Sequence, residues 1–281
     1  MKHELFKYIL VISIFYIGCA SDDKGESEEP AIIHSSCTGS VIGAVTSGNN
    51  DVLVWADEFS TDGVPCSQNW TYDIGDNGWG NNESQYYTRK NVTAKDGILK
   101  ITAKKETYLG AAYSSARIKT QDRFSFTYGR VEVRAKLPSG GGTWPAIWML
   151  GDNITSVSWP SCGEIDIMEH TGNDQGITSS AIHNASGSGN TPYVGYAANN
   201  DAVSSAFHIY AINWTAEKID FMVDDVIHYT YQPTDKNAAN WPFDANQFIV
   251  LNVAMGGSLG GAIDGSFTES AMEIDYVRVF Q

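Results

Sequence analysis

The sequence predicts an all-β protein: an antiparallel sandwich of two sheets in a single domain. Strand-length segments with period-two alternation recur along the chain, and long segments with a 3.6-residue period do not. The 27 glycines among these segments provide many positions for the turns between strands. With 281 residues, of which 42% are apolar, the chain can bury one large core, so one domain is expected.

The N-terminal segment predicts export. Two lysines, Lys2 and Lys7, together with an apolar run over residues 5–18 are typical of a signal peptide, because the run is too short to span a bilayer. Residues 16–19, YIGC, resemble the lipobox of bacterial lipoproteins, in which the cysteine becomes the lipidated first residue. We therefore expect a signal peptide at 1–18 and an outer-membrane or cell-surface lipoprotein anchored through Cys19, or a secreted protein if this segment is not processed. The acidic tract within residues 19–48 is too polar to pack and predicts a tether, which leaves 49–281 for the folded domain.

The strands are most clearly marked in two segments, GILKITAKK (97–105) and GRVEVRAKL (129–137). In both, an apolar side chain at every second position alternates with a polar or charged one, as in a half-buried strand. Two further strands and a hairpin are expected in FHIYAINW (207–214) and KIDFMVDDVIHYTY (218–231), with a tight turn at Asp224 and Asp225.

The charge of the chain excludes some partners. The formal net charge is -15, and it becomes -16 without residues 1–18, which carry two lysines and one glutamate. Such a protein repels nucleic acid and sulfated polymers, so neither is expected and a neutral partner is favoured.

The cysteines suggest one arrangement without fixing it. If Cys19 carries lipid, Cys37, Cys66 and Cys162 remain. A disulfide between Cys37 and Cys66, with Cys162 as a buried thiol, suits an oxidising compartment, but the spacing leaves the pairing open.

The segment GEIDIMEH (163–170) concentrates three carboxylates. On a regular strand Glu164 and Asp166 share a face, while Glu169 points to the opposite one. A β-bulge would absorb one residue and return Glu169 to the face of the other two. The glutamates would then be four strand steps, roughly 13 Å, apart at Cα, a gap that leaning side chains narrow towards the about 5–5.5 Å of a retaining glycosidase. The same alternation is also typical of an ordinary solvated strand. The apolar residues left for the core are Ile165, Ile167 and Met168.

Directly upstream, GTWPAIWML (142–150) places Trp144, Ala146 and Trp148 on one face. Two tryptophans on one face can stack on the apolar faces of sugar rings, although single tryptophans more often pack in a core.

The run E-x-D-x-x-E with the two tryptophans before it resembles glycoside hydrolase family 16, and specifically its laminarinase branch. The resemblance extends from about residue 52 to the C-terminus. The other segments that carry it, in the family's order, are VWADEF (54–59), NNESQYYT (81–88), NVTAKDGILKITA (91–103), SARIKTQDRFSFTYGRVEVRAKLP (115–138), GGTWPAIWMLG (141–151), FHIYAINWTAEKIDFMVDD (207–225), LNVAMGGSLGG (251–261) and IDYVRVF (274–280).

This resemblance implies a jelly roll of the concanavalin A-like type with a concave substrate cleft. It also implies a monomeric endo-β-1,3-glucanase that hydrolyses β-glucans such as laminarin with retention. Glu164 would be the nucleophile, Glu169 the acid/base, and Asp166 a partner that tunes the nucleophile. Sugar-binding positions would be Trp144, Trp148, His183, Asn82, Glu83, Arg117 and Asn252, to which we add Trp159 in the loop before the catalytic strand.

Many members of the family bind a structural Ca²⁺ far from the cleft. The matching positions here are Glu58, Gly97 and Asp275, and their oxygen atoms are of the kind that Ca²⁺ prefers. The ion would serve stability, and no cofactor is expected for catalysis.

Other functions on the same fold stay open. These are hydrolysis of mixed-linkage β-1,3-1,4-glucan, a galactan hydrolase or transglycosylase, and a β-glucan-binding protein without activity. Binding relatives usually lack one or both glutamates, and this chain has both. The Gly-, Ser- and Asn-rich segment 184–205 is expected as a loop beside the cleft, where specificity varies within the family.

Overall fold

The computed structural model describes residues 41–42, 52–199 and 202–281. The predicted signal peptide, the predicted lipobox with Cys19, and Cys37 lie outside the described residues, as does the expected tether over 19–48 except for residues 41–42. By contacts the chain divides into residues 1–33 and residues 34–281, and the fold below belongs to the second unit. No helix among the described residues is long and apolar enough to cross a membrane.

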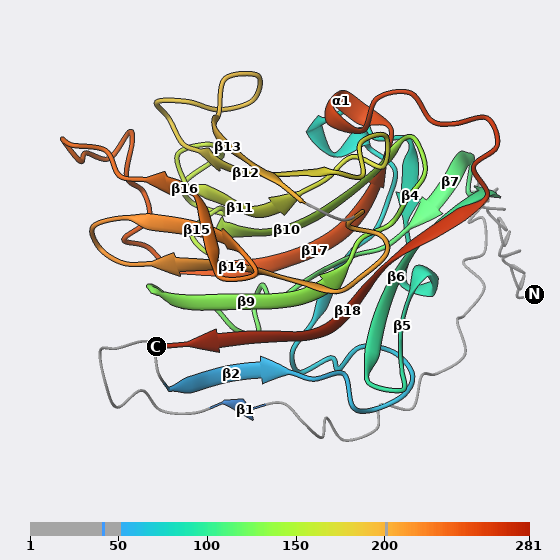
Figure 1. The fold of residues 1–281 in the computed structure, drawn as a ribbon, viewed down its shortest axis with the longest axis horizontal. Coiled ribbons are helices and arrows are strands. Elements are labelled where there is room, and N and C mark those ends of the chain that lie inside the picture. Colours follow the sequence, from blue (N-terminus) through green and yellow to red (C-terminus); the bar gives the residue numbers. More distant parts are fainter. Residues whose placement is uncertain (1–40, 43–51, 200–201) are drawn as a thin grey trace, which may run out of the picture. The chain divides into compact units, whose positions relative to one another are not determined.

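The described chain forms two sheets, which lie as two layers (Figure 1). The first has eleven strands in the order β16-β15-β14-β9-β18-β6-β7-β4, with β2 and β1 added beside β18 and β5 beside β6. Its strands are β1 (Val41–Ile42), β2 (Leu53–Asp57), β4 (Gln85–Tyr87), β5 (Val92–Lys95), β6 (Ile98–Tyr108), β7 (Ala111–Ser115), β9 (Gly129–Lys136), β14 (His208–Trp214), β15 (Ile219–Val223), β16 (Val226–Tyr231) and β18 (Glu269–Phe280).

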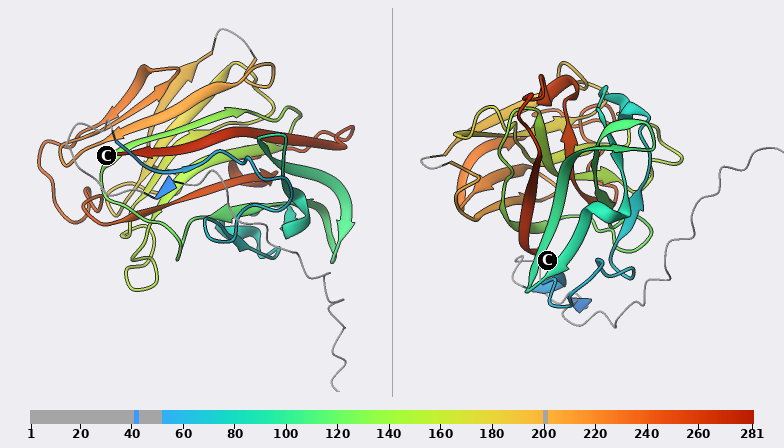
Figure 2. Two further views of the ribbon diagram at one scale, coloured as in Figure 1. Left: turned by 90° about the horizontal axis from the view of Figure 1, so that it is seen from below. Right: turned by 90° about the vertical axis from the view of Figure 1, so that its right-hand side faces the viewer.

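The second sheet has seven strands in the order β13-β12-β11-β10-β17-β8-β3. Figure 2 shows the layers from two further directions. Every pair in both sheets is antiparallel except β4 with β7. The seven strands are β3 (Thr71–Asp73), β8 (Arg117–Lys119), β10 (Thr143–Gly151), β11 (Glu164–Glu169), β12 (Ile177–His183), β13 (Tyr193–Ala198) and β17 (Gln247–Met255). The helical turns are η1 (Gly78–Gly80), η2 (Arg89–Asn91) and α1 (Gly257–Gly260).

The core lies between the sheets, where alternating side chains of each sheet meet. Val131 and Val133 of β9 are fully buried there with Ile147 of β10 and Leu251 of β17. Each aliphatic side chain of this size stabilises the fold by about 1.5–3 kcal/mol through removal of apolar surface from water. The predicted all-β antiparallel sandwich is confirmed.

The turn between β15 and β16 is also as predicted. Asp224 and Asp225 form a two-residue hairpin loop with φ of 49° and 63°. Two successive left-handed residues match the right-handed twist of the flanking strands, and aspartate tolerates this conformation.

Two further expectations have mixed outcomes. Cys66 is in a disulfide and Cys162 is a free, buried thiol, while Cys37 lies outside the described residues. The expectation of a loop over 184–205 was wrong in part, because residues 193–198 form β13 and pair with β12. The glycine-rich composition predicted a loop, because the position of this strand depends on contacts with distant residues.

Candidate active site

The bulge predicted in β11 is present. Along β10, Ala146 pairs with Glu169 and Trp148 with Asp166, so Ile167 is the additional residue. The hydroxyl of Ser180 on β12 donates a hydrogen bond of 2.7 Å to the carbonyl oxygen of Ile167. This bond satisfies a backbone group that a bulge takes out of the ladder.

The bulge places three carboxylates on one face of the seven-stranded sheet, which we call the carboxylate face. Glu164 pairs with Leu150 and Glu169 with Ala146, four residues apart on β10, as predicted. The apolar residues of the segment, Ile165, Ile167 and Met168, belong to the core on the other side.

His183 faces Glu164 and Asp166 from β12. Its Nε2 lies 3.2 Å from Asp166 Oδ2 and 3.7 Å from Glu164 Oε1. The backbone N–H of Gly189 donates to its Nδ1 at 3.2 Å. Because Nδ1 accepts, the proton of a neutral imidazole sits on Nε2, where it points at the carboxylates.

Each glutamate also receives one indole N–H. Trp144 Nε1 donates to Glu169 Oε1 at 3.0 Å, and Trp159 Nε1 donates to Glu164 Oε2 at 3.0 Å. Trp159 is 44% exposed, and its ring centroid lies 5.9 Å from that of His183. The predicted stacking residue therefore contacts the predicted nucleophile directly.

Burial dominates the electrostatics of the three carboxyl groups. It raises the pKa of Glu164 to about 8, with a further contribution from the charge of Asp166 and an opposing one from His183. Burial also raises the pKa of Asp166 and of Glu169. Carboxylates this close in a low-dielectric site cannot all ionise together. The group therefore retains a proton near neutral pH, which acid/base chemistry requires.

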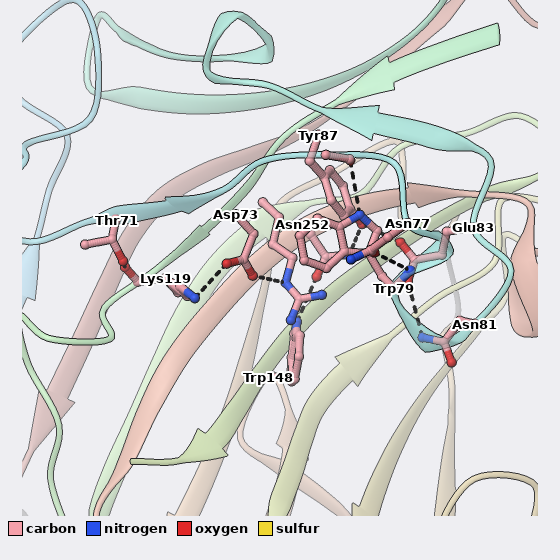
Figure 3. Close-up of polar contacts among 12 residues, drawn as sticks. Thr71, Asp73, Asn77, Trp79, Asn81, Glu83, Tyr87, Lys119, Trp148 and Asn252 are labelled. Carbon is pink, nitrogen blue, oxygen red and sulfur yellow. Dashed lines mark hydrogen bonds and ion pairs between the residues drawn. The ribbon is translucent and has the colours of Figure 1, made fainter. Parts of the chain in front are cut away.

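A chain of hydrogen bonds extends from Trp148 along the neighbouring strands (Figure 3). Trp148 Nε1 donates to Asn252 Oδ1 at 2.7 Å, Asn252 Nδ2 to the Tyr87 hydroxyl at 3.2 Å, and that hydroxyl to Glu83 Oε2 at 2.9 Å. Glu83 accepts further bonds from the side-chain amides of Asn81 and Gln85. These groups are polar, mutually oriented and suited to sugar hydroxyls.

Arg117 is held between aromatic rings and a carboxylate. Its guanidinium carbon lies 4.6 Å from the ring centroid of Trp148 and 5.2 Å from that of Trp79. Its Nε lies 2.9 Å from Asp73 Oδ2, and Lys119 Nζ lies 2.6 Å from Asp73 Oδ1. Figure 3 shows the side chains of Asp73 and Lys119 meeting beside this group.

The predicted residues thus form two groups on the carboxylate face. The first surrounds the carboxylates with Trp144, Trp159 and His183; the second joins Trp148 to Glu83, Arg117 and Asn252. Asn82 adjoins Glu83 in the chain, with left-handed backbone at φ 57°. Sequence reasoning missed Tyr87, Gln85, Asp73, Trp79 and Ser180. Tyr87 and Gln85 stand in the quoted segment NNESQYYT, but nothing local in the sequence marks their partners.

The residues expected to bind Ca²⁺ lie at a gap in the first sheet. β2 and β6 both pair with the same edge of β18. β6 pairs with Glu269–Ile274 and β2 with Val277–Phe280, so Asp275 lies between the two ladders and pairs with neither. Glu58 directly follows β2 and Gly97 directly precedes β6. The position fits an oxygen-ligated ion.

The two carboxylates of this gap are engaged by arginines. Both oxygens of Glu58 accept from Arg278, at 2.7 and 2.9 Å, and Asp275 pairs with Arg134. A cation there would compete with these ion pairs for the carboxylates, or would bind through carbonyl oxygens of the gap.

Comparison with known proteins assigns the family. Residues 80–278 match the profile of glycosyl hydrolases family 16. The chain belongs to this family. It is 43% identical over 251 residues to a beta-glucanase of Rhodothermus marinus, covering 82% of this chain and 85% of the relative.

Two solved structures of laminarinases are similar as well. The laminarinase from Rhodothermus marinus superposes with a TM-score of 0.78 at 42% identity, covering 82% of this chain and 96% of that one. The laminarinase from Flavobacterium sp. UMI-01 has a TM-score of 0.78 at 43% identity, covering 82% and 100%. The family assignment agrees with the motif that the bulged strand carries.

Proposed function

We propose that this family 16 protein is an endo-acting β-1,3-glucanase that hydrolyses laminarin-type β-glucans with retention of configuration. The observation that carries the proposal is the bulged strand β11, which brings two half-buried glutamates to one face, each with an indole N–H donor. The similarity to laminarinases supplies the substrate class.

Glu164 acts as the nucleophile in the first step. One of its oxygens forms a bond to the anomeric carbon while the bond from that carbon to the glycosidic oxygen breaks. Glu169 donates its proton to the departing oxygen, so the leaving sugar departs as a neutral alcohol. The Trp159 N–H and His183 stabilise the ionised form of Glu164 against the burial that opposes it.

In the second step Glu169 accepts a proton from water, and the water oxygen forms a bond to the anomeric carbon as the ester to Glu164 breaks. The buried site keeps the pKa of Glu169 raised, so that it can donate a proton in one step and accept one in the next. Glu164 loses its negative charge when its ester forms and regains it when the ester breaks. Asp166 and His183, which lie beside Glu164, offset this change in charge.

The proposal is tested by analysing products from laminarin, mixed-linkage glucan and agarose. We expect the wild-type protein to release oligosaccharides from laminarin and Glu164→Ser to release none. Glu217→Ser, at an exposed turn, serves as the matched control and should behave as wild type. Binding of laminarin without any release by the wild type would replace the hydrolase with a binding protein.

The mixed-linkage glucan result decides between two specificities on this face. Release from laminarin alone favours a strict β-1,3-glucanase, and comparable release from both favours the broader enzyme. Release from agarose alone would favour the galactan hydrolase instead.

We further propose that Ca²⁺ binds at the gap beside Asp275 and supports stability, not chemistry. The break between β2 and β6 supports this site, and the ion pairs of Glu58 and Asp275 limit its strength. We expect added Ca²⁺ to raise Tm and EDTA to lower it, with unchanged kcat below the transition. A Tm independent of Ca²⁺ would reject the site.

Export and anchoring are also proposed, from the N-terminal sequence. Cys19 would carry lipid and hold a monomeric enzyme at the cell surface, with the acidic tether between the lipid and the domain. Cys19→Ala should abolish labelling by palmitate in cells and release the protein from the membrane fraction. An unlabelled wild-type protein in the medium would instead indicate secretion.

A further inference from the structure

The carboxylate face contains a row of residues that crosses all seven strands. Reading the ladders in order, Asp73 pairs with Arg117, Arg117 with Asn252, and Asn252 with Ala146. Ala146 pairs with Glu169, Glu169 with Ser179, and Ser179 with Tyr196. Directly paired residues of antiparallel strands project to the same face, so Tyr196 lies on the face of the catalytic carboxylates.

Tyr196 stands at the far end of this row, on the edge strand β13 (Figure 1). Two strand spacings separate its Cα from that of Glu169, which is about 10 Å. The strand between them contributes only the small side chain of Ser179 to the row. A ring at position 196 can therefore contact a sugar that lies beyond the one next to Glu169.

The orientation of Tyr196 is fixed by packing on the opposite side of β13. A Cβ on Gly195 would lie 2.3 Å from Tyr229 Cβ, so this position takes only glycine. The rings of Tyr193 and Tyr231 lie 5.1 Å apart, on the same side as Gly195. Because alternate residues of a strand face opposite sides, Tyr196 is held towards the carboxylate face.

Tyr196 has no structural partner in the described part of the chain. It is 69% exposed and makes no hydrogen bond, ion pair or ring contact with another described residue. Its diagonal neighbour Ile177, on the same face of β12, is 42% exposed. The two form a small apolar area beside the catalytic group, and a single aromatic ring of this kind suits the apolar face of a sugar.

The side on which Tyr196 lies indicates which part of the substrate it would contact. Two polar groups suited to sugar hydroxyls, Arg117 on β8 and Asn252 on β17, lie beyond β10 on the opposite side of Glu169. Glu83 joins them through the Tyr87 hydroxyl and its backbone bridge to Gly256. If these polar groups hold the sugars before the cleaved bond, a glucan that runs along the row and is cleaved at Glu169 places its leaving part over β12 and β13.

From this geometry we propose that Tyr196 forms a stacking subsite for the leaving part of a β-1,3-glucan and thereby favours long chains over short ones. The inference rests on the proposed function and extends it to a residue outside the catalytic group. Tyr196 is a specificity-determining residue, since the bond-breaking steps do not involve it.

Two substrates test the subsite separately from the catalytic centre. The first is laminarin, which extends over β13; the second is a nitrophenyl glycoside of a β-1,3-linked glucose disaccharide, whose leaving group is one small ring next to Glu169. We expect Tyr196→Ala to lower kcat/KM on laminarin by about three- to tenfold, the size of one aromatic contact, and to leave the nitrophenyl glycoside unchanged. Tyr196→Phe keeps the ring and should retain wild-type values. Leu109→Ala, at the exposed β6–β7 turn, controls for loss of an exposed apolar side chain.

A cleavage pattern gives a second measurement that a purely structural residue would not change. With a β-1,3-glucose hexasaccharide labelled at its reducing end, Tyr196→Ala should release shorter labelled fragments, because binding modes that fill the subsite lose their advantage. An unchanged pattern and unchanged laminarin kinetics, with an active wild type, would overturn this inference and leave the proposed function intact. Equal losses on both substrates would also overturn it, by placing the effect at the catalytic centre. A wild type inactive on both substrates would overturn the proposed function itself.

Discussion

The two glutamates of β11 have the same functional group, but their surroundings differ. Glu164 lies beside Asp166 and His183 and receives the Trp159 N–H, whereas Glu169 receives the Trp144 N–H. A nearby carboxylate raises a pKa and a donated hydrogen bond lowers it, so each neighbour adjusts the proton affinity of one glutamate. Different neighbours can thus support different roles for identical side chains.

The first prediction concerns Asp166, whose charge raises the pKa of Glu164. Asp166→Asn removes that charge, so Glu164 should ionise at lower pH, and the acidic limb of the kcat/KM profile should move to lower pH. The variant also loses a charged contact with His183, and we expect kcat to fall by about 10- to 100-fold.

A pH series on laminarin measures both effects, and Asp122→Asn, in an exposed turn, is the matched control. An acidic limb that stays in place or moves to higher pH would show that Asp166 does not interact with the nucleophile as described.

At this scale the sequence predicted the chemistry better than the contacts. Glu164, Asp166 and Glu169 stand within six positions, so counting along one strand was enough to bring them together. Tyr87 lies 165 positions from Asn252, its hydrogen-bond partner. No local pattern reports such a contact, because it depends on how distant strands meet.

At the scale of the element, the bulge in β11 depends on its neighbour β12. Ser180, 1% exposed, donates to the carbonyl oxygen of the extra residue, and its hydroxyl lies 3.0 Å from His228 Nε2. The bulge was predictable from the spacing of the carboxylates, but the residue that holds it was not, since serine is common in exposed strands too.

Loss of this hydroxyl should affect both stability and rate. Ser180→Ala leaves a buried carbonyl oxygen without its partner, and we expect the free energy of unfolding to fall by about 1–3 kcal/mol. Glu169 stands two residues after the additional residue Ile167, so kcat on laminarin should fall as well. Urea unfolding and steady-state kinetics measure the two effects.

Ser205→Ala controls for removal of a hydroxyl at an exposed turn, where the bond is local. If Ser180→Ala matched this control in both measurements, the bulge would not depend on the hydroxyl.

For the whole molecule, the two-sheet class was predictable from alternation, whereas the strand order was not. The order β13-β12-β11-β10-β17-β8-β3 places residues 71–73 beside 117–119 and these beside 247–255. Such pairings join segments far apart in the chain, and their register follows from packing, as at Gly195 against Tyr229. A family resemblance implied the catalytic positions, but the row that ends at Tyr196 emerged only from the register.

The raised pKa of the catalytic residue Glu164 should reduce the stability of the whole domain near neutral pH. The pKa of Glu164 is about 8 in the folded protein against 4.5 for an unperturbed glutamate. Between these values the unfolded state releases a proton that the folded state keeps, so the stability present below pH 4.5 is lost as pH rises towards 8.

Glu164→Gln removes this loss and should raise the free energy of unfolding by about 2 kcal/mol at pH 7.5, and hardly at all at pH 4. This gain is smaller than the free energy that corresponds to the whole pKa shift of Glu164, because its side chain is 17% exposed and water screens part of the effect. Urea unfolding at both pH values, with Glu217→Gln as control, measures it. An equal gain at both would indicate better packing, contrary to this explanation.

The most direct test of the central claim is to trap the covalent intermediate. A 2-deoxy-2-fluoro β-1,3-glucosyl disaccharide with an activated leaving group slows both steps, so the ester to the nucleophile should accumulate. Peptide mass spectrometry is expected to find the added sugar on Glu164, and none in Glu164→Ser. An adduct on Glu169, or turnover of natural substrate with inverted configuration, would contradict the assignment of Glu164 as the nucleophile of a retaining β-1,3-glucanase.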